Sequence, residues 1–287
     1  MNNEKNKKLY MAISVIIIFI LLIFIIITLK NIYGNSSKQI KDSYDFLYEL
    51  EKVDAISEMD RMSINEFQEI KKVSDFANVK YTIVNNNYVI ELNDEYKVIG
   101  FFEQNVRKIY NVDKLTVKDC KEYAKKYLNK IYKGEVIFKE VKDKNLDENP
   151  FYTMVYYKMN NGYICYSNEI VIKINKYDGT LVGYSNYSGN DEKFLSNIYI
   201  TEEDSKNIFN NYMKELGLEG EIVSKPKIGY FNIDGEANQI CYIIIYKVIE
   251  KDNNVKFNDI VINAETGEIV KHIINIIELI DGEDIDK

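Results

Sequence analysis

A phrase of about ten residues occurs twice in this chain, at 172–183 and again at 261–270. The two copies lie 88 residues apart and align on Asn175 with Asn263 and on Gly179 with Gly267. Apolar, β-branched residues lead into each Asn, and glycine supplies the positive φ that a tight reversal between strands requires. Each copy therefore predicts a strand, a hairpin and a second strand. A chain that repeats at this spacing is expected to consist of copies of one unit.

A helix start precedes each copy of the phrase. Thr116 with Asp119, and Thr201 with Asp204, resemble a capping box, in which each side chain bonds the backbone amide of the other residue. The apolar faces of the two helices match in register, with Cys120, Ala124, Tyr127, Leu128 and Ile131 in one and Ser205, Phe209, Tyr212, Met213 and Leu216 in the other. Strand patterns follow both helices. This order predicts an α+β fold in which one helix packs on a small antiparallel sheet in each unit.

The whole chain is predicted to carry an N-terminal transmembrane helix followed by tandem units of this kind. The expected segments are a cytoplasmic tail (1–8), a transmembrane helix (9–29), a membrane-proximal helix (30–62), a shortened first repeat (63–110), a second repeat (111–195), a third repeat (196–278) and an acidic tail (279–287).

The part before the second repeat has a weaker pattern. Apolar residues recur at helical period over 38–59, which predicts a helix that acts as a stalk, packs on the first domain or forms a coiled coil. Ser63 and Glu66 form a second capping-box pattern, so a helix is expected from there to Ala77. Strands are expected within 79–104, and the run that ends at Asn93 resembles the opening of the repeated phrase.

Residues 9–29 form a run of 21 residues in which only Ser14 and Thr28 are polar. As a helix, the run would span roughly 31 Å, enough to cross a bilayer once. No small-residue cleavage pattern follows it, which favours an uncleaved signal anchor. Lysines flank it on both sides, at positions 5, 7 and 8 and at 30, 38 and 41, with a slight bias. We expect a single-pass protein of the cell membrane with its C-terminal domain extracytoplasmic; the opposite orientation stays open.

Charge excludes one class of partner. Residues 1–30 contain four Lys and one Glu, so the remaining chain has 33 basic and 44 acidic side chains and a net charge of −11. Such a domain repels phosphate backbones, and no nucleic-acid binding is expected. The partners expected are the membrane and another envelope protein or peptide, with the oligomeric state open.

The sequence contains no catalytic constellation. His272 is the only histidine and is expected on a strand surface, so a triad with a second histidine and a histidine-rich zinc site are both excluded. Asp178 and Glu265 lie in the hairpin turns, where acids are commonly solvated. Three cysteines without a C-x-x-C pattern indicate no metal site, and a Cys165–Cys241 disulfide stays an alternative. No enzyme activity, cofactor or metal is expected.

One loop has a partial calcium pattern. Asp143, Asn145, Asp147 and Asn149 alternate as in the first half of a calcium loop, but the glycine at the sixth place and the glutamate at the twelfth are missing. A solvated loop is the favoured interpretation.

Aromatic residues concentrate on two neighbouring strands. Because alternate residues of a strand point to opposite faces, some of these rings should face away from the core. An aromatic face or edge of this kind can receive a peptide or a partner domain. The candidate partner surface consists of Tyr152, Tyr156, Tyr157, Tyr163 and Tyr166.

Residues 151–163, with their Asn-Gly turn, and 168–184, with the Asn-x-x-x-Gly hairpin, resemble the PepSY-like superfamily. The likeness is to YcdB/YcdC-type repeat proteins and to the C-terminal repeats of the spore-germination protein YpeB. The resemblance covers about 116–275, and more weakly 63–105, and it departs from the family where Gly162-Tyr-Ile-Cys165 lacks the usual proline. It implies exported or membrane-anchored α+β units that restrain peptidases or regulate envelope or spore proteins. It brings no catalytic residues.

These features together predict a membrane-anchored, extracytoplasmic and noncatalytic module that binds or regulates another protein, such as a peptidase or an envelope or germination factor. The alternative is a structural or assembly protein that docks onto cell-wall material.

Overall fold

The computed structural model describes residues 37–56, 62–70, 78–106, 113–142, 149–188, 193–233, 235, 237–249 and 255–273. The expected cytoplasmic tail, transmembrane helix and acidic tail lie outside these ranges, as does most of the partial calcium loop. Among the described residues, no helix is both long and apolar enough to cross a membrane.

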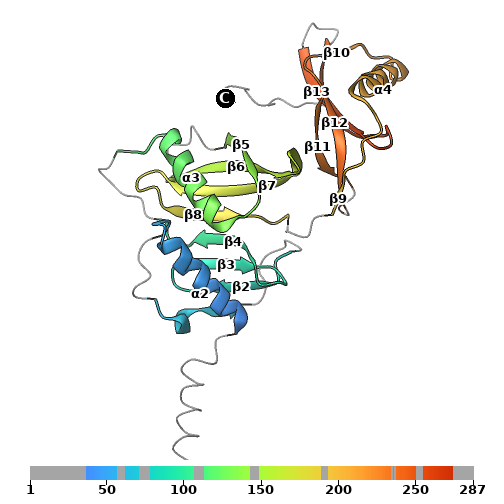
Figure 1. Cartoon of the computed structure of the whole chain (residues 1–287). Coiled ribbons are helices and arrows are strands. Elements are labelled where there is room, and N and C mark those ends of the chain that lie inside the picture. Colours follow the sequence, from blue (N-terminus) through green and yellow to red (C-terminus); the bar gives the residue numbers. More distant parts are fainter. Residues whose placement is uncertain are drawn as a thin grey trace, which may run out of the picture.

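The described chain contains both helices and strands, which confirms the mixed α+β class (Figure 1). The helical elements are α2 (Lys38–Glu51), the 3-10 turn η1 (Ile64–Glu66), α3 (Val117–Ile131) and α4 (Glu202–Glu215). The strands are β1 (Gln68–Ile70), β2 (Tyr81–Val84), β3 (Tyr88–Leu92), β4 (Val98–Glu103), β5 (Val136–Val141), β6 (Phe151–Asn160), β7 (Tyr163–Asn175), β8 (Leu181–Ser185), β9 (Phe194–Leu195), β10 (Gly220–Ile222), β11 (Lys227–Asn232), β12 (Asn238–Ile249), β13 (Val255–Asn263) and β14 (Ile269–Ile273).

The strands join into one hydrogen-bonded network. Its main path runs β1-β2-β3-β4-β8-β7-β11-β12-β13-β14, with β6 beside β7, β5 beside β6, and β9 and β10 beside β12. Neighbours are antiparallel except at β7–β11 and β9–β12, which are short parallel pairs. The expectation of small separate sheets is therefore wrong, because β7 connects them. It pairs with β6 at both of its ends, and it also pairs with β8 over Val171–Ile174 and with β11 at Ile164 and Cys165.

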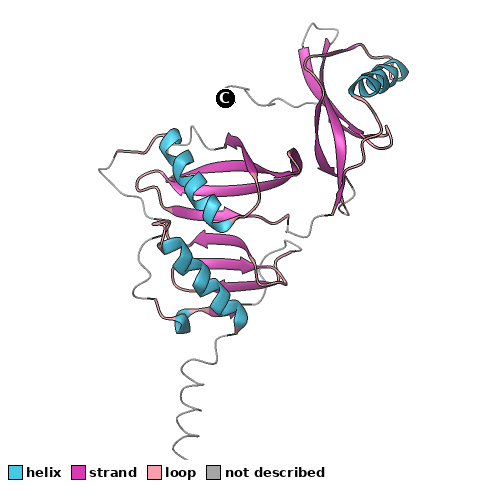
Figure 2. Ribbon diagram, viewed as in Figure 1, coloured by secondary structure: helices cyan, strands magenta, loops and turns pink. Residues whose placement is uncertain are grey.

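Helices α2 and α3 lie on the same side of strands β2–β8 and share one hydrophobic core (Figures 1 and 2). Leu47 and Leu50 of α2 are completely buried in it, together with Ala124 of α3. Of the roles kept open for the helix expected over 38–59, the structure shows packing on the first strands. Tyr127 of α3 joins the end of the α2 segment to the hairpin after β7. Its hydroxyl lies 3.1 Å from the carbonyl oxygen of Asp54 and 3.0 Å from that of Gly179.

The helix expected between Ser63 and Ala77 is wrong. The capping box of Ser63 and Glu66 forms, but it starts only η1, and Phe67 is already extended, with φ −85° and ψ 133°. Phe67 buries its ring in the core, and the following residues pair with β2 as β1. Burial and strand pairing thus override a local helix signal that is worth only about 1 kcal/mol. Residues 71–77 lie outside the described ranges.

A second core lies between α4 and one face of the β11–β14 strands. Phe209 and Met213 of α4 pack there on Tyr246, Ile244 and Ile260. In Figure 2, α4 is seen beside the β12–β13 pair, on one side of it. The sequence periodicity of the helix anticipates this, since its apolar stripe is the one that contacts the sheet.

The two copies of the repeated phrase form equivalent hairpins. In each, the Asn side chain accepts a backbone hydrogen bond two residues later, from Tyr177 to Asn175 and from Glu265 to Asn263. The Gly amide donates to the carbonyl oxygen of the same Asn, at 3.1 Å for Gly179 and 2.9 Å for Gly267. Both glycines have the positive φ expected of them, +76° and +77°.

The hairpins also hold the helix starts in an equivalent way. The residue before each cap donates its amide to the residue after each repeated Asn, Leu115 to Lys176 at 2.7 Å and Ile200 to Ala264 at 2.9 Å. Both predicted capping boxes are present, at Thr116 and Thr201. Backbone hydrogen bonds thus hold each helix start to its hairpin, and in the α4 part the Tyr199 amide adds a second one to Ala264 at 2.9 Å.

Candidate functional site

The structure does not bring the five candidate tyrosines onto one exposed face. Tyr156 is only 6% exposed and packs its ring edge on Phe138 in the first core, which Tyr152 also contacts. Tyr157 follows Tyr156 directly and therefore points to the opposite face. Tyr163 contacts the second core through Tyr230. The five tyrosines therefore lie in different environments. Tyr152 and Tyr156 contact the first core, Tyr157 lies on the opposite face of its strand, and Tyr163, at the start of β7, contacts the second core.

Two of the tyrosines instead form the joint between the strands of the first core and those of the second. Tyr166 stacks on Phe231 at 5.3 Å between ring centroids, and Tyr157 meets Tyr166 edge to face, also at 5.3 Å. The Asn232 amide donates to Ser167 Oγ at 3.0 Å next to this stack. Burial raises the pKa of Tyr166 to about 12, so this ring stays neutral at ordinary pH. Tyr157 is buried, and Tyr166 and Phe231 are partly buried, so these rings pack on one another.

The cysteines are free and buried. Cys165 pairs with Tyr230 and Cys241 with Gly229, so strand β11 lies between them. Since Gly229 and Tyr230 are consecutive, the two thiols point to opposite faces of the sheet, which does not suit a disulfide. Burial raises the pKa of both Cys120 and Cys241 to about 12, and thiols in this state are unreactive at neutral pH.

His272 is not the strand-surface residue that the sequence suggested. It lies on the side of the sheet that α4 covers, where its Nδ1 is 3.3 Å from the hydroxyl of Tyr212 and its Nε2 contacts the hydroxyl of Tyr246. The imidazole is therefore part of the packing between α4 and β12–β14. Within the described ranges, no three His, Cys, Asp or Glu side chains gather closely enough to hold a metal ion.

An apolar surface remains on the side of the β12–β13 pair that faces away from α4, and we call it the open face. Residues that are directly opposed across antiparallel strands share a face, as Ile249 does with Val255 and Lys247 with Phe257. The apolar members are Val223, Ile249, Val255 and Phe257, which are 40%, 62%, 49% and 48% exposed. Four large apolar side chains exposed at one end of a sheet are unlike the scattered exposure of an ordinary surface.

The open face continues inward to buried residues. Along β13, Val255, Phe257, Asp259 and Val261 alternate onto it, and exposure falls along this series from 49% at Val255 to 0% at Val261. Asp259 is 5% exposed, and its Oδ1 has no hydrogen-bond partner among the described residues. Burial raises the pKa of Asp259 above its ordinary value, and the charge of Lys271 acts in the opposite direction. A buried carboxyl group thus borders the exposed apolar side chains.

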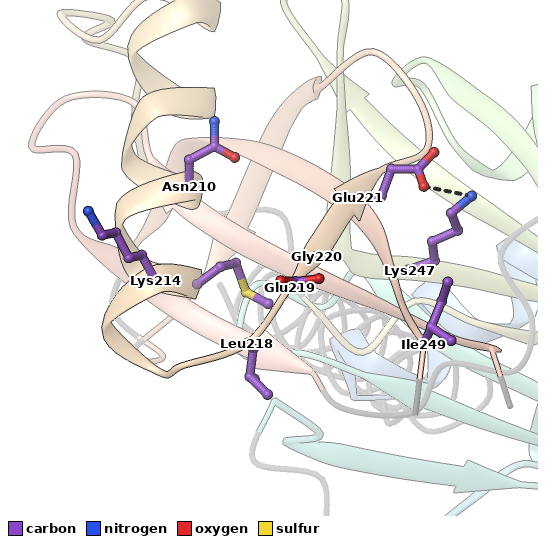
Figure 3. Close-up of a pocket in the computed structure, with 9 residues that line it drawn as sticks. Asn210, Lys214, Leu218, Glu219, Gly220, Glu221, Lys247 and Ile249 are labelled. Carbon is purple, nitrogen blue, oxygen red and sulfur yellow. Dashed lines mark ion pairs between the residues drawn. The ribbon is translucent and has the colours of Figure 1, made fainter. Parts of the chain in front are cut away.

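A groove of about 450 Å³ opens beside the edge strand β10, between that strand and α4 (Figure 3). Its middle is formed by Glu219 and Gly220, where the chain enters β10. Figure 3 shows Glu221 and Lys247 turned toward each other, with an ion pair of 2.9 Å between them. The other lining residues are Asn210, Met213, Lys214, Leu218 and Ile249. Ile249 lines the groove and is also a member of the open face, so the two meet at this residue at the edge of the sheet.

Sequence reasoning missed the open face, although a signal for it exists. The run Ile240–Ile245 is apolar at every position, Ile-Cys-Tyr-Ile-Ile-Ile. Such a run indicates that both faces of a strand meet apolar surroundings. Helix α4 packs on one face of β12, and the sequence predicts no further helix that could cover the other face.

Comparisons with known proteins found no family model and no curated protein that matches this chain. Among solved structures, the chain is similar to the Bacillus megaterium YpeB C-terminal domain, with 16% sequence identity and a TM-score of 0.45 over 73% of this chain and 89% of that one. A likeness this distant concerns the course of the chain and carries no argument about function.

Proposed function

We infer that this protein is a membrane-anchored, extracytoplasmic and noncatalytic module that binds another protein of the cell envelope through the open face. In this view the partner is a peptidase that it restrains, or an envelope or germination factor that it regulates. The observation that carries the proposal is the group Val223, Ile249, Val255 and Phe257, which stays exposed while the opposite face is covered by α4.

The physical reason is the free energy of leaving apolar side chains in water. Burying a side chain such as that of Ile or Phe gains roughly 1.5–3 kcal/mol relative to leaving it exposed. A partner that covers all four would therefore gain several kcal/mol, and aromatic anchors such as Phe257 commonly dominate binding energies. The ion pair of Glu221 and Lys247 borders these residues, as polar groups border the apolar centre of many interfaces.

Three further features support the proposal. Residues 9–29 are long and apolar enough to hold the chain in a membrane, and the net charge of −11 over the rest disfavours nucleic acid as the partner. The equivalent hairpins at Asn175 and Asn263, with their equivalent bonds to the helix starts, support tandem PepSY-like units within the joined sheet. Asn93 adds a shorter version, since its side chain accepts the amides of Glu95 and Lys97.

A capture experiment on intact cells tests orientation and binding together. Because the native cysteines in the described chain are all buried, a cysteine placed at Val255 gives one reactive thiol on the open face. We expect a membrane-impermeant, thiol-reactive photocrosslinker to label Val255→Cys on intact cells. Irradiation should then yield one stoichiometric protein partner, identified by mass spectrometry. Adding Phe257→Asp should lower the yield strongly, because a charge in the centre of an apolar contact is costly to bury.

The matched control is Asn129→Cys, an exposed position on α3 that should be labelled equally but should not capture the partner. Labelling of both thiols only after lysis would contradict the extracytoplasmic placement. Retention of wall glycan with no protein would instead support the docking of cell-wall material.

A further inference from the structure

Among the described residues of the open face, Asp259 is the acidic group that is both buried and incompletely bonded. Its side chain is 5% exposed, yet Oδ1 accepts no hydrogen bond from any described residue. The directly opposed residue on β12 is Ile245, which offers no side-chain donor. A buried polar atom without a partner costs free energy, and native proteins carry few of them. Such an atom at the border of a binding surface indicates that the partner supplies the missing donor.

The other charged groups near this face do not fill that role. Lys247 is engaged by Glu221 in the ion pair at the rim. Lys271 lies on the neighbouring strand β14, opposite Val261, and lowers the pKa of Asp259 through space without donating to its Oδ1. Asn258 points to the α4 side of the sheet, because it is opposed to Tyr246. One carboxylate oxygen is therefore left for a donor that arrives from outside.

The position of Asp259 also limits what that donor can be. Its neighbours along β13 on the same face are Phe257, which is 48% exposed, and Val261, which is completely buried. A donor must approach across Phe257 and the other apolar side chains, so it has to be carried by a segment that is itself apolar around it. A long, flexible cationic side chain meets both conditions, because its methylene stem packs on apolar surface while its charged end reaches the carboxylate.

We propose that the open face recognises a protein segment carrying one Lys or Arg among apolar residues, with the basic side chain bound to Asp259 Oδ1 and the apolar residues packed on Val223, Ile249, Val255 and Phe257. This inference rests on the proposed function and adds the chemistry of the partner. The acidic balance of the chain outside its apolar run, −11, attracts a basic segment over a longer range. Asp259 selects the partner by its charge, and the apolar residues supply most of the contact area.

The test uses the full chain with Val255→Cys, in which the partner is captured on intact cells. We expect Asp259→Asn to lower the capture yield at least about ten-fold, because the loss of one member of a buried charge pair weakens binding by that much or more. The control Glu268→Gln removes the same charge from an exposed position of the β13–β14 hairpin and should leave the yield unchanged. Asp259→Asn should not lower the melting temperature, because it relieves an unpaired buried carboxyl group. A fold-supporting role for Asp259 would move that temperature downward.

A second measurement comes from the partner. The crosslinked segment, mapped by mass spectrometry, should contain a Lys or Arg, and its replacement by Gln should lower the yield as much as Asp259→Asn does. The two substitutions together should cost no more than either one alone. Capture that Asp259→Asn leaves undiminished, or a captured segment without a basic residue, would overturn this inference while the proposed function stands. The absence of any captured protein would overturn both.

Discussion

At the scale of single residues, Gly179 and Gly267 occupy equivalent turns but have different neighbours. A Cβ on Gly179 would lie 2.7 Å from the ring of Tyr123, which packs against the first core, whereas one on Gly267 would meet the terminal methyl groups of Ile208 at 3.1 Å and Ile200 at 3.3 Å. Both positions have positive φ, which costs roughly 1–2 kcal/mol for a residue with a Cβ. The same turn therefore tolerates change differently in the two parts of the chain.

This difference predicts an order of stability among alanine substitutions. Gly162 has φ +81° and nothing within 4 Å of an added Cβ, so Gly162→Ala measures the backbone cost alone, about 1 kcal/mol. Gly267→Ala should cost slightly more, because a methyl group has to shift. Gly179→Ala should cost about 1–3 kcal/mol beyond the backbone term, because it displaces a packed ring. Urea denaturation of the full chain in detergent measures all three, and equal losses would show that Tyr123 moves freely.

At the scale of elements, the capping boxes of α3 and α4 make the two helix starts sensitive to acid. Hydrogen bonds from Thr116 lower the pKa of Asp119, and those from Thr201 lower the pKa of Asp204. A carboxylate with a lowered pKa in the folded state stabilises it above the unfolded-state pKa, about 3.8, and this stabilisation is lost as the pH falls through the lower folded value. Both helices should therefore fray at their N-termini below about pH 4.

Substituting one cap residue at a time tests the two helices independently. Thr116→Ala should destabilise α3, and Thr201→Ala should destabilise α4, by about 1 kcal/mol each. Each variant should also lose the acid sensitivity of its own helix, measured by amide hydrogen exchange between pH 5 and pH 3, while the other helix keeps it. Thr→Ser at the same positions is the control and should behave like the natural residue, since the hydroxyl remains. Unchanged exchange in both alanine variants would show that the caps contribute nothing.

The sequence predicted most elements because their signals are local. The strands at 151–160 and 227–232 follow from β-branched and aromatic runs bounded by turn residues, and both capping boxes are in place. The helix after Ser63 failed because the burial of Phe67 and the pairing of β1 are tertiary effects. The five candidate tyrosines do not form one exposed surface, and the reason is again tertiary. Tyr156 and Tyr157 were correctly placed on a strand, but which face is covered depends on the distant α3 and β11.

The joint between β7 and β11 had no sequence signal, since only two residue pairs form it. It nevertheless connects strands of the first core to those of the second, so it decides whether the described chain behaves as one body. Gly229 allows β11 to approach β7 closely, because it has no side chain. An added Cβ there would lie 2.6 Å from the carbonyl oxygen of Ile164 and 2.5 Å from the ring of Tyr166. A ring can rotate away, whereas a backbone carbonyl can move only if the strands separate.

At the scale of the whole molecule, we therefore expect Gly229→Ala to open the joint while both cores stay folded. Spin labels at Asn129→Cys on α3 and Glu215→Cys on α4, both exposed, should show a distance distribution that becomes broader in this variant. Gly217→Ala is the control, because its φ is +66° but nothing lies within 4 Å of an added Cβ. It should cost stability at the end of α4 and leave the distances unchanged.

Adding Tyr166→Ala to Gly229→Ala distinguishes the effect of the Tyr166 ring from that of the Ile164 carbonyl oxygen. This second substitution removes the ring contact but leaves the Ile164 carbonyl in place, so the joint should stay open. A return to the narrow distance distribution would show that the ring, and not the strand pairing, holds the two cores together. The exposed residues of the open face lie at the Ile249–Val255 end of the β12–β13 pair, away from Cys241, which pairs with the joint residue Gly229. Capture through Val255→Cys should therefore survive when the joint opens. Loss of capture in Gly229→Ala would instead mean that the partner contacts both cores at once.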